Sequence, residues 1–453
     1  MTHYTDIDYS RARMSRDPRF DGVFFVGVTS TGIFCRPVCP ARLPAEKNVR
    51  YFEHASHALR EGFRPCLRCR PDSAPNSYAW LGVQTTVRRA ERLLSAIPPQ
   101  PVAKIASRLG ISNRYLNKLV NTHFGVSPKT YQTMQKVLFA KQLLQQSVLP
   151  VDEVAHSCGF ENARALQRAV KQYCKVTPAS LRRAQGHAGQ TPALTLFLPY
   201  RPPYHWRQVR TFLQQRAVAG TESVSDNSYW RCLGDEDGSG YVMARHHPDR
   251  HGFAVTVSVD NLQFTHKIIA SLSRVLDLHA DPRVIRDTLI AAGIPEALIT
   301  EGLRLPGCWS AFEAGCRAIL GQQVSVKAAV NQVANLTREL GEATSLGTAF
   351  PCAESVAESE LSFLKMPGAR KQALRDFARY CTVNADINVK DVLALKGIGP
   401  WTVSYLQMRG FSEPDIYLEG DLIVRKIAAQ HLLNPEKAHP WRSYLTMQLW
   451  QLA

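Results

Sequence analysis

Four cysteines near the amino terminus place the tightest constraint on how this chain can fold. Three residues separate Cys35 from Cys39 and two separate Cys66 from Cys69, and the span between the pairs is long enough for a strand, a turn and a helix. Four thiolates at this spacing suit a tetrahedral zinc ion. A segment as short as residues 1–80 needs such a link to stay folded, so the sequence predicts a small zinc domain.

The other seven cysteines, from Cys158 to Cys381, are scattered and predict only small buried side chains. The first twenty residues are charged throughout, which does not fit a signal peptide, and no apolar run is long enough to span a bilayer. We therefore expect a cytoplasmic protein without disulfides and without membrane association.

The formal charge of +17 is distributed unevenly along the chain. Residues 1–186 contain 28 lysines and arginines against 12 acidic residues, whereas the remainder contains 27 against 26. Residues 101–150 contain seven basic side chains and no acidic one. This pattern indicates a nucleic-acid partner for the amino-terminal part, with an ordinary solvated basic face as the alternative.

The residues around the cysteines, TGIFCRPVCPAR and GFRPCLRC, resemble the N-terminal domain of Ada, the alkylation-response sensor. In that family the first cysteine, here Cys35, is both a zinc ligand and the irreversible acceptor of a methyl group from a DNA phosphotriester. The resemblance further implies that Thr31, Arg42 and Arg64 contact the DNA backbone. A purely structural zinc site is the alternative.

Zinc would keep Cys35 as the thiolate, which is the nucleophilic form. Four thiolates around zinc carry a formal charge of −2, and methylation of one sulfur reduces it to −1, which lowers the repulsion of DNA phosphates. The same reaction would therefore repair DNA and increase DNA affinity.

An internal repeat follows the zinc segment. PVAKIASRLGISNRYLNKLVNTHFGVSP at residues 101–128 matches PVDEVAHSCGFENARALQRAVKQYCKVTP at residues 150–178. Each copy reads as an apolar helix, a glycine turn (Gly110 or Gly159), a capping residue (Ser112, or Glu161-Asn162) and an amphipathic helix. This order is typical of a helix-turn-helix unit, whose second helix enters the major groove.

Two such units joined by a helix over about residues 129–148 resemble the DNA-binding domain of the AraC family. Behind an Ada-type zinc domain, this implies a transcription activator with RNA polymerase as a further partner. Each basic side chain could equally contact a phosphate or only water. The side chains expected to read DNA are Asn113, Arg114, Asn117, Lys118, Asn162, Arg164 and Arg168.

A linker over residues 185–192 and an α+β domain are expected next. Of the apolar stretches LTLFLPY, GYVMARHH and GFAVTVSV, the last two suit strands, and helices are expected at WRQVRTFLQQRAV and THKIIASLSRVLDL. Nothing in this domain carries chemistry on its own.

Near the carboxyl terminus, the turn LKGIGPW carries Gly397 and Gly399 ahead of a helix that starts around Trp401. Glycine leaves backbone N–H groups open to a phosphate at a helix start. Asp421 follows as a lone carboxylate in YLEGDLIV. An aspartate before an apolar run is usually a helix cap, and aromatic residues at helical spacing, such as Trp401 and Tyr405, are usually core.

These stretches, together with AILGQQVSV and YRPPYHWRQVRTFL, resemble the AlkA-type 3-methyladenine DNA glycosylases of the helix-hairpin-helix superfamily. The resemblance implies that Asp421 is the catalytic acid and that Gly397 and Gly399 grip DNA. Gln323 stands where the family has a leucine wedge, and glutamine can fill that space. The base pocket would be lined by Trp401, Tyr405 and Trp450.

The implied reaction is release of an alkylated purine after base flipping. An alkylated ring nitrogen makes the base a cation and a good leaving group, and aromatic faces attract cations by roughly 0.5–2 kcal/mol per contact. Asp421 would stabilise the oxocarbenium-like sugar or orient water. Bifunctional relatives carry a lysine where this chain has Trp401, so we expect no lyase step. The Pro-Cys-His-Arg motif of O6-methylguanine transfer is absent from the sequence.

The sequence thus predicts a multidomain protein, mainly α with α+β parts. It would act as a monofunctional glycosylase and a methyl sensor on alkylated and promoter double-stranded DNA, as a monomer with zinc as its metal. A purely regulatory protein that uses the glycosylase module only as a DNA clamp is the alternative. The expected domains are a zinc domain at 1–80, a double helix-turn-helix at 85–185, an α+β domain at 190–300 and an all-α helix-hairpin-helix domain at 301–453.

Overall fold

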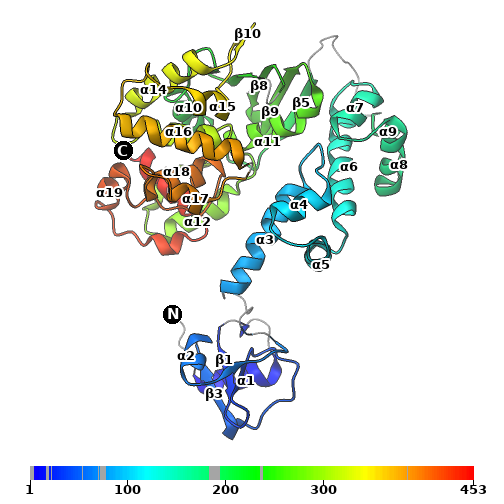
Figure 1. The fold of residues 1–453 in the computed structure, drawn as a ribbon, viewed down its shortest axis with the longest axis vertical. Coiled ribbons are helices and arrows are strands. Elements are labelled where there is room, and N and C mark those ends of the chain that lie inside the picture. The colour runs from blue at the N-terminus through cyan, green and yellow to red at the C-terminus, as the bar shows by residue number, and fades with distance from the viewer. Residues whose placement is uncertain are drawn as a thin grey trace. The chain divides into compact units, whose positions relative to one another are not determined.

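The structure is a computed structural model of the chain, and it forms two compact units, residues 1–132 and 133–453, which are described separately (Figure 1). The residues that it describes are 5–16, 20–21, 23–53, 55–69, 71, 78–182, 194–234, 238–384 and 386–453. The linker expected at residues 185–192 lies outside them. Within this part of the chain, no helix is long and apolar enough to cross a bilayer.

The zinc domain is a small sheet with short helices. Its strands run in the order β3-β1-β2-β4, with β1 antiparallel to β2 and β3, and β2 parallel to β4. The elements are α1 (Asp6–Ser15), β1 (Phe25–Val28), β2 (Ile33–Cys35), η2 (Glu46–Asn48), β3 (Val49–Phe52), α2 (Ala55–Arg60) and β4 (Arg64–Pro65).

Two apolar clusters stabilise this sheet. Phe25 packs with Phe34, Phe52 and Phe63 in one cluster. Its neighbour Val26 belongs to the other cluster, with Tyr9 of α1. Because successive strand side chains point to opposite faces, the alternation along β1 supplies both clusters.

The rest of the first unit is the first helix-turn-helix. Its helices are α3 (Tyr78–Leu94), α4 (Val102–Arg108) and α5 (Asn113–Phe124), and α6 (Pro128–Gln146) begins here and continues into the second unit. Gly110 makes the turn with φ +67°, and the Ser112 side chain accepts a hydrogen bond from the Tyr115 N–H to start α5. The apolar residues of α3, α4 and α5 share one core.

The second copy has the same order in the second unit. Its helices are α7 (Val151–Ser157), α8 (Ala163–Cys174) and the short α9 (Pro178–Leu181). Gly159 makes the turn with φ +69°, and Asn162 caps α8 through the Ala165 N–H. Asn162, and not Glu161, is therefore the capping residue. The repeat and the joining helix expected at 129–148 are confirmed as structural elements.

The α+β part contains a five-stranded antiparallel sheet in the order β5-β9-β8-β7-β6. The stretches GYVMARHH and GFAVTVSV form strands as predicted, and LTLFLP is a strand as well. The strands over residues 222–224 and 228–233 were not predicted. The elements are β5 (Leu194–Pro199), α10 (Trp206–Gln214), β6 (Glu222–Val224), β7 (Ser228–Leu233), β8 (Gly240–His247), η6 (Pro248–Arg250), β9 (Gly252–Val259), η7 (Leu262–Phe264) and α11 (Thr265–Val275).

The carboxyl-terminal part is helical, with one ladder of two-residue strands. Its elements are α12 (Pro282–Ala291), η8 (Glu296–Leu298), α13 (Ala311–Leu320), α14 (Val326–Leu340), β10 (Ala343–Thr344), β11 (Gly347–Thr348), α15 (Ala353–Glu358), α16 (Gly368–Val383), α17 (Val389–Leu393), α18 (Pro400–Gly410), α19 (Leu422–Ala428), η9 (Pro435–Ala438) and α20 (Arg442–Gln451). These helices bury two apolar clusters, one around α13 and α16 and one around α19 and α20, and α18 contributes to both.

A buried ionic network attaches the sheet to α13. Arg231 of β7 donates to Glu313 at 2.6 Å, and Arg317 donates to Glu222 of β6 at 2.6 Å and to Glu313 at 2.7 Å. Burial opposes the charge of Glu313, but Arg231 and Arg317 outweigh it and hold the pKa of Glu313 below its ordinary value. Removal of one partner would leave a buried charge unpaired, so the network fixes how α13 meets the sheet.

The predicted fold class is confirmed: a small metal-binding domain, two helix-turn-helix units, an α+β domain and a helical domain follow one another along the chain. The domain boundaries at 80, 185 and 300 stay predictions.

Candidate functional sites

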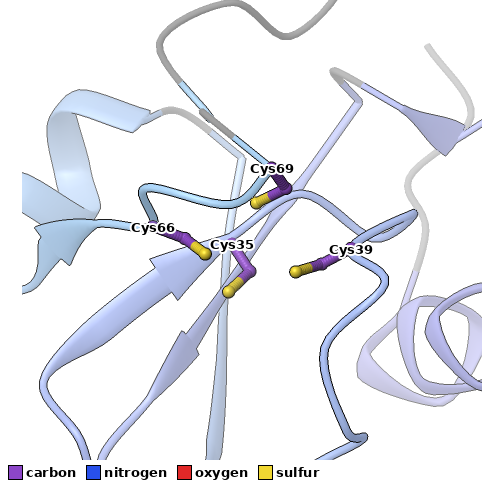
Figure 2. Close-up of side chains that lie close together, drawn as sticks. All are labelled: Cys35, Cys39, Cys66 and Cys69. Carbon is purple, nitrogen blue, oxygen red and sulfur yellow. The ribbon is translucent and has the colours of Figure 1, made fainter.

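The four cysteines of the amino-terminal pattern meet in one place (Figure 2). Cys35 is the last residue of β2, and Cys39 follows after a short turn. Cys66 comes directly after β4, which pairs with β2, and Cys69 closes the next turn. The parallel pairing of β2 and β4 therefore brings the two sequence pairs together.

All four sulfur atoms lie within 4.8 Å of one another, and Cys39 and Cys69 are buried. A hydrogen bond to Cys35 lowers the pKa of Cys69 to about 6, and the same contact raises the pKa of Cys35. Four anionic sulfurs this close would repel one another, so the donor set suits a dication that neutralises them. The cluster fits zinc.

A surface cavity of about 200 Å³ opens beside Cys35. Thr31 and Arg42, both predicted to contact DNA, line it together with Cys35, Cys39 and Cys66. Arg64 is exposed on β4, opposite Ile33, and is not among the lining residues. The sulfur of Cys35 is thus reachable from the surface beside two of the three predicted contacts.

Arg36 contacts the cysteine cluster and also lines the surface cavity beside Cys35. Its backbone N–H donates to the Cys69 sulfur at 3.3 Å, and its side chain forms an ion pair with Asp21. Sequence reasoning did not identify Arg36, although its place next to a ligand is a signal for such a role.

The side chains predicted to read DNA lie on the second helix of each repeat or at its start. Asn113, Arg114, Asn117 and Lys118 are exposed on α5. Asn162, Arg164 and Arg168 are exposed at the start of α8 and along it. Asn162 is occupied as the helix cap, so it has less hydrogen-bonding capacity left for a base. No residue-level contact with DNA is tested, and these roles stay predictions.

Asp421 lies at the start of α19 and is half-buried. Its Oδ1 accepts from the backbone N–H groups of Ile423 at 3.0 Å and Val424 at 3.1 Å, so it is the helix cap that an isolated aspartate predicts. The indole N–H groups of Trp450 and Trp401 donate to Oδ1 and Oδ2, each at 3.2 Å. The capping interpretation is therefore confirmed, and the catalytic role of Asp421 stays a prediction.

Each indole that reaches Asp421 is stacked on a second aromatic ring. Trp401 stacks on Tyr405 with centroids 5.3 Å apart, and Trp450 stacks on Phe212 with centroids 6.2 Å apart. The three predicted pocket residues, Trp401, Tyr405 and Trp450, therefore lie around the predicted acid. They come from α18 and α20, which are separated by about thirty residues of sequence.

Two residues beside this group were missed. Phe212 comes from α10, and no pattern in the sequence links it to Asp421. Arg409 donates to the Tyr405 hydroxyl at 3.0 Å and lies 4.6 Å from the Phe212 centroid. The spacing of 401, 405 and 409 on one helix face was a signal that could have found Arg409.

The glycine turn before α18 has the predicted form. Gly397 has φ +87°, which favours glycine, and an added Cβ would lie 3.0 Å from the Ala373 side chain. Gly399 is the N-cap of α18 with φ −103°, and a Cβ there would meet no atom within 4 Å. The fold therefore requires glycine at 397 but not at 399.

The loop between α13 and α14 carries Gln323, the residue at the expected wedge position. Gln323 is exposed and has φ +56°, a conformation that is uncommon for a residue with a side chain. Its neighbour Gln322 donates to the Gly397 carbonyl at 3.1 Å and to Thr402 at 3.0 Å. These hydrogen bonds connect the loop between α13 and α14 to the glycine turn and the start of α18.

Comparison with known families identifies three parts of the chain. Residues 8–72 match the metal binding domain of Ada, residues 105–184 match a helix-turn-helix domain, and residues 195–310 match the AlkA N-terminal domain. The four-cysteine cluster is thus a zinc site of the Ada type, and the predicted resemblances are confirmed.

Three curated proteins show how far the similarity extends. The "Probable bifunctional transcriptional activator/DNA repair enzyme AlkA" of Mycobacterium tuberculosis is 34% identical over 97% of this chain and 95% of its own length. DNA-3-methyladenine glycosylase 2 of Escherichia coli is 32% identical over 56% of this chain and 95% of its length. The bifunctional transcriptional activator/DNA repair enzyme Ada of Escherichia coli is 30% identical over 43% of this chain and 52% of its length.

Proposed function

The chain belongs to the family of bifunctional transcriptional activators and DNA repair enzymes that includes AlkA of Mycobacterium tuberculosis, and we propose that it combines three activities. Cys35 accepts methyl groups from DNA phosphotriesters, the paired helix-turn-helix units bind promoter DNA as an activator, and the carboxyl-terminal part releases alkylated purines by hydrolysis. The observation that carries the last activity is the position of Asp421 between two indole N–H groups.

For the methyl transfer, Cys35 is the ligand sulfur that both lines the surface cavity and ends strand β2. Cys35, Cys39, Cys66 and Cys69 would hold zinc, which keeps the sulfurs deprotonated at neutral pH. The Cys35 sulfur attacks the methyl carbon of the phosphotriester, the carbon–oxygen bond breaks, and the phosphodiester leaves as an anion. The thioether that forms has lost the negative charge of Cys35, so the domain repels DNA phosphates less.

The cavity walls support a backbone substrate. Thr31 offers a hydroxyl and Arg42 a guanidinium beside Cys35, and both groups are donors suited to phosphate oxygens. Arg64 is exposed on the neighbouring β-strand, β4, and would contact another phosphate of the same DNA strand. Because none of these donors reads a base edge, the reaction would not depend on sequence.

For base release, the target nucleotide leaves the duplex and its base enters the space beside Trp401, Tyr405 and Trp450. Aromatic faces hold a cationic base more strongly than a neutral one. The exposed Gln323 would fill the gap that the base leaves in the duplex. Gly399, where the fold leaves open space, would present its backbone N–H to a phosphate of the same DNA strand.

The two carboxylate oxygens of Asp421 are not equivalent. Oδ1 accepts three hydrogen bonds, from Ile423, Val424 and Trp450, whereas Oδ2 accepts only that of Trp401 among the residues that the structure describes. Oδ2 therefore keeps acceptor capacity. It is the oxygen that would face the positive charge on the sugar or orient the attacking water as the glycosidic bond breaks.

The test is release of free 3-methyladenine from methylated duplex DNA by the wild type and by Asp421→Asn. Asparagine keeps one oxygen for the helix cap but places an NH2 group against an indole N–H and removes the negative charge. We expect folded protein with release reduced by about a hundred- to a thousandfold, the size of effect known for loss of one group that stabilises charge in the transition state.

A mutant that is as active as the wild type would contradict the role of Asp421. A folded wild type that releases no base, yet binds DNA and accepts methyl groups, would favour the alternative of a regulator that uses this module only as a DNA clamp.

A further inference from the structure

The side chains around Asp421 form a closed ring. Trp401 donates to Asp421 and stacks on Tyr405, and Tyr405 accepts a hydrogen bond from Arg409. Arg409 lies over Phe212, Phe212 stacks on Trp450, and Trp450 donates back to Asp421. Asp421 and the buried Arg409 are therefore connected by two paths of aromatic side chains, one through Trp401 and Tyr405 and the other through Trp450 and Phe212.

The arginine in this ring is buried and lacks a carboxylate partner. Arg409 is 3% exposed and also donates to the Gly307 carbonyl, and its Nε has no hydrogen-bond partner among the residues that the structure describes. Arg216 lies 3.7 Å from the Phe212 centroid and donates to the Phe212 carbonyl. No ion pair joins either guanidinium to an acid within the described part of the chain.

Arg409 and Arg216 line one small cavity with Arg231, Arg317, Glu222 and Glu313, so four guanidinium groups share two carboxylates there and two positive charges stay uncompensated. A buried charge without compensation costs stability, because it has lost its contact with water. Burial lowers the pKa of Arg216 to about 10, which still leaves it charged at neutral pH. The fold therefore tolerates two fixed positive charges directly behind the walls of the base pocket. Packing alone does not explain this arrangement, because an apolar side chain would fill the same space at lower cost.

Arg409 also fixes how Tyr405 can act. A guanidinium only donates hydrogen bonds, so the Tyr405 oxygen is the acceptor in the bond to Arg409. The Tyr405 O–H can then donate a hydrogen bond to a base bound beside it. A neutral base that presents a carbonyl or an unprotonated ring nitrogen offers such an acceptor.

We propose that Arg409 is a specificity-determining residue that sets the relative rates at which the enzyme releases cationic and neutral bases. This inference rests on the proposed glycosylase function and on the base pocket at Trp401, Tyr405 and Trp450. A cationic base is attracted by the ring faces and by Asp421, but it is repelled by Arg409 through the wall formed by Tyr405 and Phe212. A neutral base feels no such repulsion. The fixed charge thereby reduces the preference for cations and admits uncharged lesions.

The experiment compares single-turnover release of 7-methylguanine, a cationic lesion, with release of hypoxanthine, an uncharged purine of similar size, from otherwise identical duplexes. The proteins are the full-length wild type, Arg409→Met and Arg409→Lys. Methionine fills the space without charge, so we expect the ratio of the two rate constants to shift towards 7-methylguanine by roughly tenfold, the effect of removing one partly screened charge at this range. Lysine keeps the charge and should keep the ratio near the wild-type value.

Equal loss of both rates in Arg409→Met would mean that Arg409 only supports the walls, and it would overturn the proposal. Thermal unfolding controls for folding, and if Arg409→Met does not fold, Arg216→Met provides the same test with a smaller shift in the same direction. A wild type that releases neither base would overturn the proposed function and this inference with it. If the wild type releases both bases and the ratio of the two rate constants is unchanged in Arg409→Met and in Arg216→Met, the role of Arg409 in specificity is overturned and the proposed glycosylase function stands.

Discussion

The cysteine cluster and the aromatic group around Asp421 are built in opposite ways. The cysteine cluster takes all four side chains from residues 35–69, around one pair of adjacent strands. The aromatic group around Asp421 takes Phe212, Trp401, Asp421 and Trp450 from four helices or helix ends along nearly 240 residues. The positions of the metal ligands follow from the short spacing of the cysteines in the sequence, whereas the aromatic rings meet only when the second unit has folded.

This difference predicts different responses to damage. Loss of one ligand removes most of the energy that folds the small domain, because metal binding and folding are coupled there. Loss of one side chain next to Asp421 leaves the apolar cluster around α13 and α16 intact and truncates only part of the cluster around α19 and α20, to which Phe212 belongs and against which Trp401 and Trp450 pack. Each of the following predictions compares a damaging change with a matched one.

The largest effect is expected for Cys39→Ala. Without this buried ligand, zinc binding and the sheet β3-β1-β2-β4 should be lost together, as chelation of zinc should also show. Amide hydrogen exchange of strands β1 to β4 measures the loss. The matched control is Cys352→Ser, since Cys352 is a helix cap outside the cluster and serine can replace it in that role. A protected sheet in metal-free Cys39→Ala would show that the apolar clusters suffice without zinc.

A smaller effect is expected for the two indole donors. Trp401→Phe removes the only donor that the structure shows on Oδ2 of Asp421, and Trp450→Phe removes one of three donors on Oδ1. A hydrogen bond to a charged group contributes about 1.5–3 kcal/mol, so Trp401→Phe should slow base release by about ten- to a hundredfold. Trp450→Phe should slow it less. Single-turnover rates decide the order, and a larger loss in Trp450→Phe would reverse the assignment of Oδ2 as the reacting oxygen.

The smallest effect is expected in the glycine turn. Gly397→Ala forces a side chain into φ +87° and close to Ala373, which should cost about 1–2 kcal/mol of unfolding free energy. Gly399→Ala has an ordinary φ and open space, so its stability should change by about 0.5 kcal/mol or less. Urea unfolding measures both. Duplex affinity should nevertheless fall in Gly399→Ala, and unchanged affinity there would remove the argument for backbone contact with a phosphate.

The comparison also shows what a sequence can predict. The zinc ligands, the repeat and the caps at Ser112 and Asn162 follow from spacings of a few residues, and the structure confirms them. Asp421 and its aromatic neighbours could be predicted only through a family resemblance, because nothing local distinguishes a catalytic aspartate from a helix cap. The structure shows that this residue is a cap and also the acceptor of two indole N–H groups.

The parts that could not be predicted depend on contacts between distant segments. Phe212 reaches Trp450 only because α10 packs beside α20. Strand β6 has only three residues, and β7 carries the charged Arg231 at a buried position, so neither strand shows a regular alternation of apolar and polar residues. The Glu222–Arg231–Glu313–Arg317 network likewise joins the neighbouring strands β6 and β7 to α13, which lies more than seventy residues further along the chain. Charge pairs of this kind carry no spacing signal.

The most direct test of this account is a crossed assay of one protein preparation for both chemistries. Wild type, Cys35→Ser and Asp421→Asn are incubated with methylated duplex DNA, and released 3-methyladenine and methylated protein are measured by mass spectrometry. We predict that Cys35→Ser loses methyl acceptance and keeps base release, and that Asp421→Asn keeps methyl acceptance at Cys35 and loses base release. Base release at the wild-type rate by Asp421→Asn, or a methylated site other than Cys35 in the wild type, would contradict the assignment of the two sites.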